Sequence, residues 1–475
     1  MPVPHERHGQ RKLAVGDSQR KGEAAEERRT CGLLPENENQ WMQLGSRRSV
    51  RRELELRRQH AGDVLPAPIA KRDASIEFCL ADEATGKCSN IVAGGEKRFA
   101  AEEIAHRRRR YSASRPQNEN EARRLSDPLL IYGATGYSGR LITEAAVALG
   151  LAPVLCARNR DALAAVAAAV GLKCRVAELS EPNQLDEALR GITVVLHAAG
   201  PFSQTSPPML EACLRCHAHY LDITGEISVI ESLVHANARA RSAGIMVMPA
   251  VGFDVVPSDC MAAHVTSRLP GASSLVLALT GLVSATPGSA KTLVEQAGHS
   301  VRVRRGGKIA SIAAGSVSRW FDYGNGPRCS MNISWGDVAS AFYTTGIPNI
   351  DVFYEATPAL RGMLLASRYA SWMLRSAPWQ ASLAATMNFL PQGPTDAQRA
   401  AAQMVIVAEA RDDRGRCARA RLRTPEAYTF TATTATAVAR RVLRGDLEIG
   451  FQTPARVYGA DWVLSFANVS RENLE

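Results

Sequence analysis

Short apolar runs alternate with amphipathic segments between residues 128 and 251. Strands are predicted where four to eight apolar residues are bounded by turn residues, and these runs are PLLIY (128–132), APVLCARN (152–159), KCRVAEL (173–179), TVVLHAAG (193–200), HYLDIT (219–224) and IMVMPAV (245–251). Helical periodicity is seen in LITEAAVALG (141–150), DALAAVAAAVG (161–171), NQLDEALRG (183–191), PPMLEACLRC (207–216) and ISVIESLVHANARARSAG (227–244). This alternation predicts an α/β fold, a doubly wound parallel sheet with helices on both faces.

The pattern changes after about Ser258. Strand-like runs at 273–283, 301–312 and 404–413 are separated by turns, and residues 431–445 form a helical pattern that ends at Gly445. We therefore predict a Rossmann domain over 127–258 and a second α+β domain, for substrate or dimerisation, over 259–425. Residues 426–475 are predicted to form a separate C-terminal segment.

Residues 1–126 differ in composition from the rest of the chain. They are rich in Arg, Glu, Gln and Asn and hold 25 of the 57 basic and 19 of the 47 acidic residues. Such a segment buries too little apolar surface to offset its ordering entropy, so we expect a dispensable, disordered extension. A basic arm for nucleic acid or anionic lipid is the alternative, which the interleaved acids disfavour. The remaining residues have a net charge of only +4, so no nucleic-acid partner is expected.

A glycine-rich turn joins the first predicted strand to the first helix. It reads Gly133-Ala-Thr135-Gly136-Tyr137-Ser138-Gly139. In such a turn the first glycine permits the tight bend, the second lets a pyrophosphate approach the backbone and the third permits close helix–strand contact. The free N–H groups of the following helix favour an anion. These residues are therefore predicted to bind a dinucleotide.

The ends of the second and fourth strands complete the predicted cofactor site. Arg158 and Asn159 follow the second strand, where an NAD-binding protein usually has an acid for the ribose 2′-OH. Because a guanidinium can pair with a 2′-phosphate, NADP is the expected cofactor. After the fourth strand, Gly200, Pro201 and Phe202 are expected beside the nicotinamide ribose.

Three acids follow later strands and are the candidate catalytic residues. Asp222 and Glu226 lie in YLDITGE, and Asp254 lies in VGFDVVPSD. At the carboxyl edge of the sheet they could position substrate or relay a proton. They could equally cap the helices that follow.

Other patterns carry less weight. The string Cys213-Leu-Arg-Cys216-His217 matches a haem-attachment motif but lies on a predicted sheet-covering helix, and no zinc spacing accompanies it, so no metal is expected. The arginine-interrupted apolar segment 359–383 favours an amphipathic helix at a domain interface or on a membrane surface over a membrane span. With ten cysteines and no apolar leader, the chain is expected to be cytoplasmic.

The chain resembles the saccharopine dehydrogenase-like proteins and, within them, the trans-acting enoyl reductase-like group. The resemblance rests on GATGYSG (133–139), HAAGPF (197–202), YLDITGE (220–226), VGFDVVPSD (251–259), TPGSAKT (286–292) and GDVASAFYTTGIPNI (336–350), and it extends over about 127–466. It implies an NADP-type Rossmann domain, a second α+β domain and a C-terminal helix that returns to the first domain. His197 stands where the group more often has Asn.

The expected function is an NADP-dependent oxidoreductase that reduces a C=C or C=N bond of a small-molecule or acyl substrate. A short-chain dehydrogenase proper is disfavoured, because none of the ten tyrosines has Lys four positions later. A non-catalytic NADP-sensing or scaffold protein stays open as the alternative. Contact with a membrane surface and a homodimer also stay open.

Overall fold

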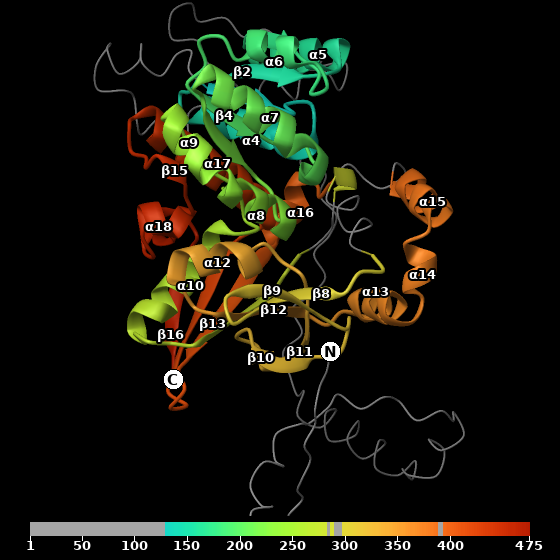
Figure 1. Ribbon diagram of the computed structural model, residues 1–475, viewed down its shortest axis with the longest axis vertical. Coiled ribbons are helices and arrows are strands. Elements are labelled where there is room, and N and C mark those ends of the chain that lie inside the picture. Colours follow the sequence, from blue (N-terminus) through green and yellow to red (C-terminus); the bar gives the residue numbers. More distant parts are fainter. Residues whose placement is uncertain (1–128, 283–285, 289–296, 388–392) are drawn as a thin grey trace, which may run out of the picture. The chain divides into compact units, whose positions relative to one another are not determined.

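The computed structural model of the 475-residue chain describes residues 129–282, 286–288, 297–387 and 393–475. The extension expected over 1–126 lies outside these ranges. Within them, the chain forms a parallel sheet with flanking helices and a second, mixed sheet (Figure 1).

The first sheet has seven parallel strands in the order β15-β6-β5-β4-β1-β2-β3. The strands are β1 (Leu129–Tyr132), β2 (Val154–Ala157), β3 (Cys174–Val176), β4 (Val194–His197), β5 (His219–Asp222), β6 (Met246–Met248) and β15 (Gly450–Phe451). Apart from β15, this is the strand order of a doubly wound dinucleotide-binding sheet. The fold class predicted from the alternation is confirmed.

The helices that cover this sheet match the predicted segments but differ at their ends. They are α4 (Tyr137–Ala148), α5 (Arg160–Val170), α6 (Pro182–Ala188), α7 (Phe202–Cys216), α8 (Ile227–His235) and α9 (Asn237–Ala243). The helix predicted from Pro207 begins five residues earlier, at Phe202, because Glu226 accepts hydrogen bonds from the first backbone N–H groups of α7. The single helix predicted over 227–244 is divided at Ala236.

The second sheet has nine strands within the described residues. Its order is β10-β11-β12-β7-β13-β14-β16, and the hairpin β8–β9 pairs with β12. The strands are β7 (Ser274–Thr280), β8 (Val301–Arg305), β9 (Lys308–Ile312), β10 (Ser318–Asp322), β11 (Pro327–Asn332), β12 (Asn349–Glu355), β13 (Gln403–Arg411), β14 (Cys417–Pro425) and β16 (Ser470–Leu474). Among the described strands of this sheet, all pairings are antiparallel except that of β12 with β7. The mixed α+β region expected after Ser258 is therefore present.

The remaining helices connect and cover the two sheets. They are α10 (Val256–Arg268), α12 (Asp337–Thr345), α13 (Pro358–Tyr369), α14 (Ser371–Leu374), α15 (Ala377–Met387), α16 (Asp396–Ala401), α17 (Ala427–Leu443), α18 (Pro454–Tyr458) and the short 3₁₀ helix η2 (Trp462–Ser465). No helix among the described residues is long and apolar enough to cross a membrane.

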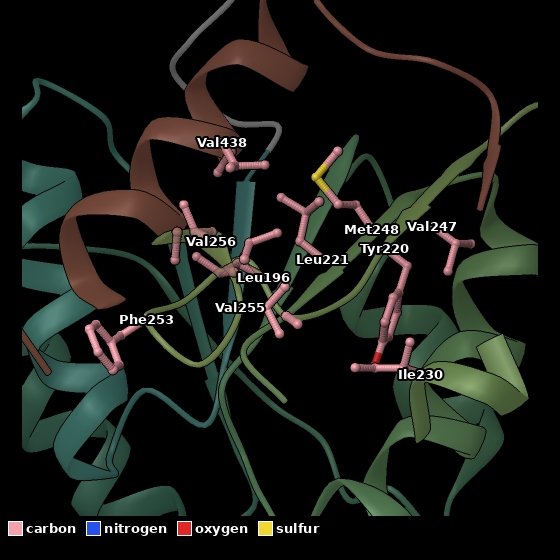
Figure 2. Close-up of a cluster of buried hydrophobic side chains, with 14 of the residues drawn as sticks. Leu196, Tyr220, Leu221, Ile230, Val247, Met248, Phe253, Val255, Val256 and Val438 are labelled. Atoms are coloured by element: carbon pink, nitrogen blue, oxygen red, sulfur yellow. The ribbon is translucent and has the colours of Figure 1, made fainter. Parts of the chain in front are cut away.

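The long helix α17 packs against the first sheet. It contacts α4, β4 and β5, and Figure 2 shows Val438 of α17 above Leu196 of β4 and Leu221 of β5, all fully buried. Thr434 Oγ1 donates a hydrogen bond to the Val251 carbonyl at 2.9 Å, and Phe253 N donates to Thr431 Oγ1 at 2.9 Å. α17, which follows β14 of the second sheet, thereby holds the loop after β6, where Asp254 lies.

Candidate active site

The glycine turn between β1 and α4 is fixed by its own backbone. Gly133 has a φ of +86°, which favours glycine, and its N–H donates to the Cys156 carbonyl of β2 at 2.8 Å. A Cβ at Gly139 would lie 2.1 Å from the Gly133 oxygen. These two glycines are therefore required by the turn itself, whether or not a ligand binds.

Neither the backbone conformation nor a close contact requires glycine at position 136. This difference from Gly133 and Gly139 points to a ligand. A Cβ added there would meet only the Gly133 oxygen, at 3.4 Å, and the φ of −74° is accessible to any residue. Gly136 precedes α4, whose first turn has no acidic residue and whose N-terminus has no side-chain cap. The exposed backbone at Gly136, flanked by the half-buried Thr135 and Ser138, fits an approaching pyrophosphate.

The two residues that follow β2 have different environments. Asn159 caps α5, because its side-chain oxygen accepts a hydrogen bond from Ala162 N at 3.0 Å. Arg158 is exposed, and its guanidinium forms no hydrogen bond or ion pair with any described residue. Arg158 is therefore the side chain at this edge that remains available to a 2′-phosphate.

The loop after β4 is held by Glu226. One carboxylate oxygen accepts a hydrogen bond from Phe202 N and the other from Ser203 N, both at 2.8 Å. Phe202 is buried and its ring stands edge-on to His197, with 5.3 Å between the ring centroids. Glu226 thus fixes the segment Gly200–Phe202 that was predicted to lie beside the nicotinamide.

His197 is enclosed at the end of β4. Its Nε2 lies 3.0 Å from Thr205 Oγ1, whereas its buried Nδ1 has no hydrogen-bond partner within the described chain. Burial lowers the pKa of His197 to about 3, so the imidazole is neutral. At this position the neutral ring packs against Tyr132, Phe202 and Tyr220.

Asp222 is fully buried, and both of its carboxylate oxygens accept hydrogen bonds from the backbone or a neighbouring hydroxyl. Oδ1 accepts hydrogen bonds from Thr224 N at 3.0 Å and Ala250 N at 2.8 Å, and Oδ2 accepts one from the Tyr220 hydroxyl at 2.7 Å. The pKa of Asp222 is raised to about 6 by burial, although these donors oppose the shift. Its contacts join the loops after β5 and β6.

Asp254 has different surroundings from the other two acids. It is half-buried, and its carboxylate accepts no hydrogen bond from any described residue. A Cβ at Gly225 would lie 2.8 Å from Asp254 Oδ2, so the carboxylate lies against the loop that carries Glu226. Burial raises the pKa of Asp254 to about 6. The loops that bear Phe202, Glu226 and Asp254 are therefore neighbours.

Sequence reasoning missed a cluster that covers Tyr137 of the glycine turn. The Tyr137 hydroxyl donates to the Pro394 carbonyl at 2.5 Å and accepts a hydrogen bond from Arg399 Nη1 at 2.7 Å. Its ring stands edge-on to Tyr428 of α17, with 5.2 Å between centroids. The capping-box pattern Thr395-x-x-Gln398 predicts the start of α16. No local pattern could have placed that helix on a residue more than 250 positions earlier.

The comparisons with known proteins agree with the resemblance seen in the motifs. Residues 133–264 match a family model described as NAD(P)H-binding. The chain is 32% identical over 165 residues to a trans-acting enoyl reductase of Mycobacterium ulcerans, covering 33% of this chain and 39% of that protein. It is 25% identical over 168 residues to a saccharopine dehydrogenase-like oxidoreductase of Homo sapiens, covering 31% and 39%.

These alignments span less than half the length of each curated relative. The fold similarity reaches further, because apo saccharopine dehydrogenase (L-Glu forming) from Saccharomyces cerevisiae superposes with a TM-score of 0.51 at 11% identity. That comparison covers 73% of this chain and all of the yeast chain. Through its NAD(P)H-binding Rossmann domain, the chain is thus similar to the saccharopine dehydrogenase-like proteins and to the trans-acting enoyl reductases.

Proposed function

We propose that the protein is an NADP-dependent oxidoreductase that reduces a C=C or C=N bond of a small-molecule or acyl substrate. The glycine turn, the match to an NAD(P)H-binding family and Arg158, which is unpaired among the described residues, support the cofactor. The names of the relatives, an enoyl reductase and a saccharopine dehydrogenase-like oxidoreductase, support the reaction class. When bound, the dihydronicotinamide supplies hydride to one end of the double bond.

The observation that carries this proposal is the state of Asp254. Reduction of a polarised double bond needs a proton at the atom that does not receive hydride. Asp254 is half-buried and accepts no hydrogen bond from the described chain, and its partial desolvation raises its pKa to about 6. A carboxyl group with a pKa of about 6 is protonated in part of the molecules near neutral pH, and it can donate that proton. We assign the proton transfer to Asp254.

The other two candidate acids are positioning residues in this proposal. Glu226 holds the loop Gly200–Phe202 through two backbone N–H groups. Asp222 holds the loops after β5 and β6 through Thr224 N and Ala250 N. Each carboxylate oxygen of the two acids already accepts a hydrogen bond within the chain.

The test compares wild type with Asp254→Asn. NADPH oxidation is followed across a panel of enoyl and imine substrates, beside a titration of NADPH binding. We expect Asp254→Asn to lower turnover by about 100-fold or more while NADPH affinity changes little. Asp259→Asn is the matched control, because burial also raises the pKa of Asp259 to about 6, but its carboxylate caps α18 through Ala455 N. Its turnover per folded molecule should persist.

Two results would contradict the proposal. Full turnover by Asp254→Asn would remove Asp254 as the proton donor. NADPH binding by wild type without oxidation of any substrate in the panel would favour a non-catalytic NADP-sensing or scaffold protein.

A further inference from the structure

Large hydrophobic side chains are exposed together on the helices α13 to α15. Nine such side chains are exposed in the described ranges, and five of them belong to these helices: Met363, Leu365, Tyr369, Trp372 and Trp379. Trp372 and Tyr369 retain 77% and 72% of their accessible surface. Figure 1 draws the three helices (orange) at the margin of the second sheet. A grouping of this kind marks an interaction surface.

The opposite face of α13 and α14 is packed against the region of the β8–β9 hairpin, so Tyr369 and Trp372 cannot be buried by rolling these two helices inward. Leu364 is buried in a cluster with Val301, Val303 and Ala314. Gly298 N donates a hydrogen bond to Ser367 Oγ at 3.1 Å, and Leu374 is buried. These contacts fix which face of α13 and α14 is exposed.

The charge of this segment has one sign. Between residues 356 and 395 there are three arginines, Arg361, Arg368 and Arg375, and no acidic residue. Arg361 Nε donates to the Ala356 carbonyl, whereas Arg368 and Arg375 are exposed. The guanidinium carbon of Arg368 lies 5.4 Å from the centre of the Tyr369 ring. The segment thus exposes one aromatic ring with a guanidinium group beside it, together with further exposed tryptophans and the exposed Arg375.

We propose that α13 to α15 bind the surface of an anionic lipid bilayer. Trp and Tyr prefer the headgroup region, because their rings are apolar and their N–H or O–H stays hydrated. Arginines at the same level attract anionic headgroups while their aliphatic stems cover apolar surface. A protein partner would need acidic residues opposite the arginines and an apolar groove for the aromatic rings. An anionic bilayer offers negative headgroups and an apolar interior over its whole surface. The bilayer is therefore the occupant that this surface fits best.

The experiment uses the full chain and sedimentation with phosphatidylcholine vesicles, with and without phosphatidylserine. Wild type should bind the phosphatidylserine vesicles more tightly, and added salt should weaken the binding. Trp372→Ala combined with Trp379→Ala should reduce binding roughly ten-fold or more. Arg368→Gln and Arg375→Gln should each reduce it by about five-fold.

Trp320→Ala is the control, because Trp320 is 57% exposed but belongs to β10. It should bind like wild type. Circular dichroism of the tryptophan variants checks that they are folded. Vesicles should shift the tryptophan fluorescence of wild type to the blue, and they should not shift that of the variant that lacks Trp372 and Trp379.

Three outcomes would overturn the proposal. Wild type does not bind either kind of vesicle. The tryptophan variant binds as tightly as wild type, which would place the lipid contact elsewhere in the chain. Wild type is a dimer that Trp372→Ala converts to a monomer, which would assign the surface to a second copy of this chain.

Discussion

Arg399 donates a hydrogen bond to the hydroxyl of Tyr137 at 2.7 Å, although the two residues are 262 positions apart in sequence. Its guanidinium carbon also lies 5.8 Å from the centre of the Tyr137 ring. Tyr137 is the first residue of α4 and belongs to the predicted pyrophosphate turn, whereas Arg399 belongs to α16, just before β13 of the second sheet. The second sheet region is therefore tied to the helix on which the cofactor is expected to bind.

This contact should contribute measurably to stability. Tyr137→Phe removes the hydroxyl that Arg399 and the Pro394 carbonyl both use, so we expect a loss of about 1–3 kcal/mol in the free energy of unfolding. Arg399→Met should cost a similar amount, and the double variant should lose less than the sum of the two. Urea unfolding of the four proteins measures this coupling.

The control for that cycle is Arg190→Met. Arg190 pairs with Glu187 on the surface, where both side chains are more than half exposed, so the effect should stay within about 0.5 kcal/mol. Strictly additive losses for Tyr137 and Arg399 would show that the contact contributes nothing to stability.

Periodicity predicted the first sheet well because its signals are local. Each buried parallel strand is a short apolar run, and each helix carries its own period, so the chain order alone specified the doubly wound fold. The helix ends were harder to predict. The start of α7 at Phe202 depends on Glu226, which is 24 residues away and has no local relation to it.

The same distinction between local signals and contacts of residues far apart in sequence holds for the candidate site. The glycines of the turn follow from a motif with a strand before it and a helix after it. The three acids could not be separated from sequence, because a capping Asp and a free Asp look identical there. Only their contacts distinguish Asp222, which has three donors, from Asp254, which has none among the described residues.

Glu226 should prove important for the stability of the loop Gly200–Phe202. Glu226→Gln replaces one acceptor oxygen by an NH₂ group that would face Phe202 N or Ser203 N, both of which donate at present. Because a buried N–H would lose its partner, the free energy of unfolding should fall by about 1–3 kcal/mol. Thermal unfolding measures this, and an unchanged melting temperature would contradict the assigned role.

The pH profile of turnover should report Asp254. Its carboxyl group must be protonated to donate, and burial raises its pKa to about 6, so kcat/KM should decline as pH rises above about 6. In Asp254→Asn the residual rate should lack this decline. A wild-type profile that stays flat from pH 5 to 8, about the range that brackets this pKa, would argue against Asp254 as the donor.

Asp337 should lower stability at neutral pH. It is fully buried, Ser258 Oγ donates to its Oδ2, and Oδ1 has no partner within the described chain. Burial holds its pKa well above the usual 3.8, so folding favours the neutral acid. Stability should then fall as pH rises from about 4 through the folded-state pKa. Asp337→Asn should raise the melting temperature at pH 7, and the difference should shrink in acid.

Glu409→Gln provides a control of opposite sign. Although burial alone would raise the pKa of Glu409, hydrogen bonds and ion pairs with Arg411 and Arg319 lower it to about 2. Its contribution to stability is present above the unfolded-state pKa and is lost as pH falls. Glu409→Gln should therefore lower the melting temperature at pH 7. If both variants shift in the same direction, the assigned charge states are wrong.

The choice between NADP and NAD should depend on Arg158. Its guanidinium is exposed at the end of β2 and has no hydrogen-bond partner in the described chain. The neighbouring Asn159 caps the N-terminus of α5 with its side chain. A charged hydrogen bond contributes roughly 1.5–3 kcal/mol, which corresponds to about ten- to a hundred-fold in affinity. Arg158→Ala should weaken NADPH binding by that factor and leave NADH binding nearly unchanged, because NADH has no 2′-phosphate.

Titrations of both cofactors at low and high salt test this assignment. Since the guanidinium is exposed, salt should screen the contact, and the loss caused by Arg158→Ala should be smaller at high salt. Arg302→Ala is the control, because Arg302 is also exposed but lies on β8 of the other sheet, so it should affect neither cofactor. A wild-type preference for NADH, or an equal loss of both cofactors in Arg158→Ala, would mean that Arg158 does not contact a 2′-phosphate. The carboxyl edge of β2 would then have to recognise the ribose through its backbone, because Arg158 is followed by the capping Asn159 and the first acid, Asp161, lies inside α5.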